Sequence, residues 1–113
     1  MVITKEVSTY EVRMLSGFGN EIATVYLNET GPTPNAGYIG YASFIKDGHP
    51  LPANVRWSNG VLNIYFPLAA MVPLLDTLRN ERPVFVRYNT DLNWGSIATT
   101  AEAVGEQEPQ PIP

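Results

Sequence analysis

Alternating apolar and polar positions near the start of the chain indicate β-structure. In residues 9–15, the apolar side chains of Tyr10, Val12 and Met14 alternate with charged ones, which is the period of two of a half-buried strand. After a glycine-containing break, residues 22–27 form a second extended run rich in β-branched side chains. The two segments predict an antiparallel pair of strands.

The middle of the chain predicts another strand and a hairpin. Residues 38–46 have strand character, and residues 55–57 and 61–66 are short extended runs on either side of Asn59 and Gly60. An Asn-Gly pair between two extended runs favours a tight turn, because its glycine readily takes a positive φ. We therefore expect residues 61–66 to form a central strand.

A change of period after Pro67 predicts the principal helix. Apolar side chains now recur three or four residues apart, at Leu68, Met71, Val72, Leu75 and Leu78, the spacing of one helix face. A proline inside a helix would destabilise the helix by about 3 kcal/mol, whereas residues in the first turn need no backbone N–H for the hydrogen bonds of the helix. The helix is thus predicted over residues 72–80 with Pro73 in its first turn, and with Leu75 and Leu78 facing the sheet.

The remaining sequence predicts two strands and a tail. Residues 84–89 alternate again, residues 90–94 form a polar loop, and residues 96–103 are extended. Residues 105–113 carry three prolines and two glutamates but only one apolar side chain, so this segment cannot bury enough apolar surface to offset its own ordering. We expect one domain over residues 1–104 and an acidic tail that contributes little to folding.

These elements define the expected fold class. The chain has 113 residues, 44% of them hydrophobic, which suits a single domain with one core. We expect an α+β fold, with a curved, mainly antiparallel sheet of about six or seven strands and one principal helix packed on a face.

Charge and composition narrow the function classes. The net charge is −4, but three acids lie beyond residue 101, and the body before it holds seven bases and eight acids. The body therefore has no basic stripe, and the net charge disfavours nucleic acid without excluding it. Residues 1–10 lack the apolar run of a signal peptide, and no apolar stretch approaches the ~20 residues that span a bilayer. These features favour a cytoplasmic protein without membrane contact.

Candidate catalytic and cofactor residues are few. The chain has no cysteine and a single histidine, His49, in a Gly/Pro turn, so thiolate chemistry and His-based or Cys-based metal sites are not expected. Gly17 and Gly19 precede a predicted strand, whereas a phosphate-binding glycine loop precedes a helix. We expect a protein that is not an enzyme and holds no metal or cofactor.

Aromatic side chains beside arginines are the candidate partner-binding residues. Aromatic residues and arginine dominate binding hot spots. We expect exposed side chains in two adjacent pairs and at one loop position: Arg56, Trp57, Arg87, Tyr88 and Trp94.

Two stretches near the end of the chain resemble a known pattern. LDTLRNERPVFVRYN (residues 75–89) and TTAEAVGEQE (residues 99–108) are similar to a pattern in small uncharacterised bacterial proteins, a resemblance that brings no activity or site residue with it. The order of several strands followed by one helix is also similar to Whirly-like single-strand-binding domains. The chain departs from that order by continuing into further strands, and it lacks a basic face.

Two functions are consistent with these features. The first is a small non-catalytic protein-interaction or assembly module that acts as a homo-oligomer, with a homodimer expected, because short strands leave edges that a partner must cover. The alternative is a single-stranded nucleic-acid-binding domain that stacks bases on aromatic rings and contacts phosphates through basic groups. Its candidate residues are Trp57, Tyr65, Tyr88 and Trp94 for stacking, with Lys46, Arg56 and Arg87 for phosphates.

Overall fold

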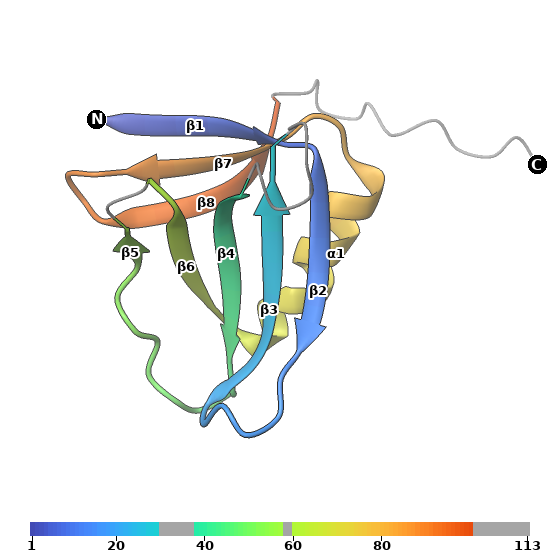
Figure 1. The fold of residues 1–113 in the computed structure, drawn as a ribbon, viewed down its shortest axis with the longest axis vertical. Helices are drawn as coiled ribbons and strands as arrows, with labels where there is room; N and C mark the ends of the chain where they lie inside the picture. Colours follow the sequence, from blue (N-terminus) through green and yellow to red (C-terminus); the bar gives the residue numbers. More distant parts are fainter. Residues whose placement is uncertain (30–37, 58–59, 101–113) are drawn as a thin grey trace, which may run out of the picture.

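The computed structural model describes residues 1–29, 38–57 and 60–100, which form eight strands and one principal helix (Figure 1). This confirms the predicted α+β class. The strands are β1 (Val2–Val7), β2 (Thr9–Met14), β3 (Glu21–Asn28), β4 (Tyr38–Ile45), β5 (Val55–Arg56), β6 (Leu62–Pro67), β7 (Val84–Asn89) and β8 (Trp94–Thr99). A single 3-10 turn, η1 (Leu68–Ala70), leads into the helix α1 (Met71–Asn80).

The strands form two sheets, which corrects the expectation of one curved sheet. The larger sheet has the order β2-β3-β4-β6-β5 and the smaller one the order β1-β7-β8. Neighbouring strands are antiparallel except β4 and β6, which run parallel. β1 is not among the strands that the alternation predicts. It joins β2 through Ser8 alone, whose amide donates to the Asn28 carbonyl over 2.7 Å, and there the chain passes from one sheet to the other.

The parallel pair depends on a glycine in β4. A Cβ at Gly40 would lie 2.7 Å from the backbone carbonyl oxygen of Leu62, its register partner in β6. The obstructing atom belongs to the backbone and cannot rotate away. Only glycine lets β4 and β6 approach this closely.

One face of the larger sheet forms the core. Its fully buried side chains include Val25 and Leu27 of β3 and Phe44 of β4, and Leu62 and Ile64 of β6 continue the same face. α1 lies behind this sheet in Figure 1, and the smaller sheet crosses its upper end. The inner face is therefore covered by two separate elements.

The helix matches its predicted extent and, apart from Val72, its predicted face. Pro73 lies in the first turn, as expected, and Leu75 and Leu78 pack against the core from half-buried positions. The most buried helical side chain is Leu74, at 8% exposure, whereas Val72 is 78% exposed. The prediction for Val72 was wrong, because a residue two positions from Leu74 lies on the opposite side of the helix.

The hairpin between β7 and β8 is anchored to the larger sheet. Asn54 accepts a hydrogen bond from the Tyr65 amide at 3.0 Å and donates to the Asn93 carbonyl at 3.3 Å, so one side chain links β6 to this hairpin. Trp94 was predicted in a loop, but it is the first residue of β8 and pairs with Asn89. The two sheets are thus joined by a side chain as well as by Ser8.

The predicted central strand and its turn glycine agree with the structure. β6 lies between β4 and β5, which confirms a central strand, and Gly60 has a φ of +87°. Asn59, the end of the predicted strand at residues 101–103 and the tail at residues 105–113 lie outside the described residues. Within the described ranges, no helix is long and apolar enough to cross a membrane.

The helix face can be tested by truncating two neighbouring side chains. Leu74→Ala should lower the free energy of unfolding by about 2–5 kcal/mol, because it leaves a cavity over the sheet. Val72→Ala is the matched control and should change it by no more than about 0.5 kcal/mol, since the side chain is exposed. Urea denaturation measures both variants. Equal losses at the two positions would contradict the observed packing.

Candidate functional site

Four of the five candidate partner-binding residues are exposed. Trp57 and Trp94 are 50% and 48% exposed, and Arg56 and Arg87 are also exposed. Tyr88 is only 4% exposed, which corrects the expectation of an exposed ring. Along β7 it shares a face with the buried Val84 and Val86, and its hydroxyl donates to the Asn93 side chain. Tyr88 therefore belongs to the core.

Trp94 and Arg87 lie on the outer face of the smaller sheet. The register places Trp94 opposite Asn89, and Asn89 opposite the exposed Val2. Arg87 lies in the next outward row, between Thr4 and Ser96. The exposed Leu92 belongs to the adjoining hairpin turn. This end of the sheet thus presents several apolar side chains to solvent.

Arg56 and Trp57 belong to the other sheet. Arg56 is opposite Leu62 in β6, and the Trp57 amide donates to the Val61 carbonyl at 2.8 Å. β5 nevertheless lies beside the β7–β8 hairpin (Figure 1), to which Asn54 is hydrogen-bonded. The two predicted groups therefore reach the same end of the molecule from different sheets.

The outer face of the larger sheet carries a polar and aromatic network that the sequence analysis missed. The rings of Tyr26 and Tyr41 meet edge to face with centroids 4.9 Å apart, and the Arg13 guanidinium lies 4.4 Å from the Tyr26 centroid. Arg13 is also paired with Glu11 at 2.6 Å. The alternation of β3 and β4 could have revealed this face, since tyrosines occupy positions between buried ones. Arg13, the one arginine among the described residues of this face, is neutralised by Glu11.

A second network continues across this face. The Ser43 hydroxyl donates to the Asn63 side-chain oxygen at 2.9 Å, and the Asn63 amide donates to the Tyr65 hydroxyl at 3.0 Å. These polar groups bind one another, so the outer face is satisfied internally and offers few unmatched donors to a ligand.

The free edge of β8 is the most distinctive feature of the smaller sheet. β8 pairs with β7 on one side, and no described strand pairs with its other side. Its sequence, WGSIAT, contains no charge and no proline. An apolar groove of about 290 Å³ runs beside this edge, between residues Gly95 to Ile97 and the helix residues Pro73, Leu74 and Thr77. Phe66 and Ala70 complete its lining.

The other sheet edges carry features that discourage pairing. β1 presents Lys5 on its inward row beside Val86, and charges on an edge strand oppose the addition of another strand. β2 carries the Glu11–Arg13 ion pair, and β5 has only two residues. Among the edges that the structure describes, β1, β2 and β8 each have six residues, and of these three β8 is the one without a charge.

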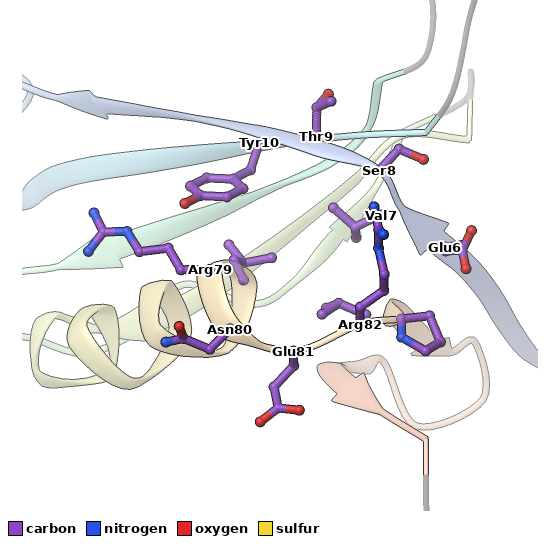
Figure 2. A pocket seen from close by; sticks show the side chains of 12 residues that line it. Glu6, Val7, Ser8, Thr9, Tyr10, Arg79, Asn80, Glu81 and Arg82 are labelled. Carbon is purple, nitrogen blue, oxygen red and sulfur yellow. The ribbon is translucent and has the colours of Figure 1, made fainter. Parts of the chain in front are cut away.

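A larger cavity lies at the other end of the helix. It has a volume of about 850 Å³ and separates the bend between β1 and β2 from the end of α1 and the loop before β7. Figure 2 shows Arg79 and Arg82 on the helix side and Ser8, Thr9 and Tyr10 on the strand side. The lining of the cavity is thus polar, and its charged residues are two arginines and two glutamates, Glu6 and Glu81.

The described residues contain no group of three or more His, Asp or Glu side chains that could hold a metal ion. His49 is exposed in the turn after β4. Gly17 and Gly19 precede the strand β3, as predicted, and no helix begins there.

Comparison with known proteins gives no match: no protein-family model, curated protein or solved structure matches the chain. The resemblance of residues 75–89 and 99–108 to small bacterial proteins stays a prediction.

Proposed function

We propose that this chain is a non-catalytic protein-interaction module that forms a homodimer through the free edge of β8. The observation that carries the proposal is a six-residue edge strand without charge or proline, beside an apolar groove. Unpaired backbone N–H and C=O groups on such an edge favour the addition of another strand. The unpaired edge of β8 is therefore suited to hydrogen bonding with a strand of another chain.

The sequence of β8 is suited to pairing with a second copy of itself. An antiparallel pair centred on Ile97 places Ile97 opposite its own copy, with Ser96 opposite Ala98 and Gly95 opposite Thr99. Each of these pairs joins side chains that share a face of the sheet, because both members differ from Ile97 by the same number of residues. No like charges meet in this arrangement, and a twofold axis relates the two strands.

The surroundings of β8 supply the apolar area that a short strand lacks. A stable interface buries about 800 Å² on each partner, more than one six-residue edge provides. Trp94 at the start of β8, the neighbouring Leu92 and the groove over Phe66 are apolar. The nearly balanced charge of the chain before residue 102 also limits repulsion between copies.

The geometry gives less support to single-stranded nucleic-acid binding. That function needs a continuous basic groove with exposed aromatic rings. Tyr88 is buried, Trp57 and Trp94 come from different sheets, and Arg13 on the tyrosine-bearing face is paired with Glu11. Self-association therefore accounts for more of the observed features.

A lysine on the outward row of β8 tests the interface. Ser96→Lys should weaken dimerisation at least tenfold, about 1.4 kcal/mol, because a lysine on an edge strand opposes strand addition. Thr4→Lys is the matched control, since Thr4 lies in the same outward row on β1, the opposite edge of this sheet. Sedimentation equilibrium of the full chain gives the dissociation constants.

The expected result is a dimer for the parent and for Thr4→Lys, and mainly monomer for Ser96→Lys at the same concentration. A monomeric parent at 100 µM, roughly the range of weak complexes, would overturn the proposal. Equal dissociation constants for the two lysine variants would also overturn it, because they would place the interface elsewhere.

Removal of the acidic tail tests whether the tail contributes to dimerisation or to the stability of the fold. A chain ending at Val104 should keep the dimer mass, and its free energy of unfolding should change by no more than about 0.5 kcal/mol, since the tail has a single apolar residue. Thermal denaturation and sedimentation test both expectations. A full-length monomer that dimerises only after truncation would show that the tail blocks association.

A further inference from the structure

We infer that the 850 Å³ cavity between the end of α1 and the β1–β2 bend binds a small anion with two negatively charged groups, such as two phosphates or two carboxylates. This inference is independent of the β8 interface, because no residue of β8 lines the cavity. Its volume lies within the ~300–1,000 Å³ of small-molecule sites. A polar lining suits a charged ligand.

Two arginines provide the positive charge. Arg79 is in the last turn of α1, and Arg82 is in the loop that leads to β7. Neither guanidinium forms an ion pair with another described residue. In Figure 2 the Arg79 side chain extends on the side of Tyr10, and the Arg82 side chain extends toward Ser8. The two positive groups are therefore separated, which matches a ligand with two separated anionic groups.

The opposite wall supplies the Tyr10 hydroxyl. Ser8, Thr9 and Tyr10 line the cavity from the strand side, and Figure 2 shows the Tyr10 ring on the side that faces α1 and the Thr9 side chain on the other side of the strand. A hydroxyl can donate a hydrogen bond to an anionic oxygen, and arginine binds phosphate and carboxylate with two parallel N–H donors. Donors thus approach the cavity from both walls.

Two glutamates, Glu6 and Glu81, are among the lining residues of the cavity, and both side chains lie at its margin. Figure 2 shows the Glu81 side chain directed away from the strands and Glu6 beyond the bend. The Asp76 carboxylate accepts a hydrogen bond from Asn80 at 2.8 Å, which holds it on the helix. No carboxylate occupies the space between Arg79 and Arg82 among the residues shown.

The end of α1 makes the arginines essential for this site. The C-terminal end of a helix carries a partial negative charge, which favours cations and opposes anions. An anion can bind here only if the guanidinium groups outweigh that charge. Removing either arginine should therefore have a large effect.

Inorganic diphosphate is the probe for this site. Titration calorimetry on the full chain, at constant ionic strength set with sodium chloride, should show saturable binding to one site per chain. Arg79→Gln and Arg82→Gln should each weaken the affinity by about tenfold or more, the effect of losing a charged hydrogen-bonding partner. Arg13→Gln is the matched control, because Arg13 is paired with Glu11 on the outer face of the larger sheet, and its affinity should equal that of the parent.

Three results would overturn the inference. Absence of saturable binding at millimolar diphosphate would show that the cavity takes no such anion. An equal loss in Arg13→Gln would show that binding follows overall charge. Binding by a chain ending at Thr100 but not by the full chain would show that the acidic tail, rather than a small anion, occupies the site. Circular dichroism of each variant confirms that the fold is retained before affinities are compared.

Discussion

Burial of the inner face of the five-stranded sheet is the constraint on which the rest of the structure depends. A ten-residue helix is too short to cover five strands, and its most buried side chain is Leu74. The remaining area is covered by the smaller sheet, whose Val86 and Tyr88 complete the core. A Cβ at Gly95 would lie 2.5 Å from the Ile64 side chain, which shows how closely β8 approaches the larger sheet.

Both candidate sites lie at the boundaries of α1 and the smaller sheet, the two elements that cover the inner face. The groove follows the boundary between α1 and β8, and the larger cavity follows the boundary between the end of α1 and the bend at Ser8. The apolar groove suits a protein strand, and the polar cavity suits a charged small molecule. The different side chains at the two boundaries are the reason for proposing a different kind of partner for each.

Local sequence patterns predict the elements better than they predict their arrangement. Period-two alternation locates β2 and β7, and the spacing of leucines locates α1. Neither pattern reveals that the chain changes sheets at Ser8 or that β4 and β6 run parallel, because these features depend on contacts between distant segments. Tyr88 illustrates what could have been predicted, since it shares the period of the buried Val84 and Val86. The cavity arginines gave no signal, because Arg79 and Arg82 meet the strand wall only in the folded chain.

Amide hydrogen exchange in β8, followed as a function of protein concentration, tests the proposed dimer most directly. Backbone amides on the free edge of β8 exchange quickly in a monomer and slowly once a second strand pairs with them. Pairing through β8 predicts that protection at residues 94–99 rises with concentration, while protection in β1 stays constant. Protection of β8 that is independent of concentration in a chain that dimerises would contradict an interface at this edge.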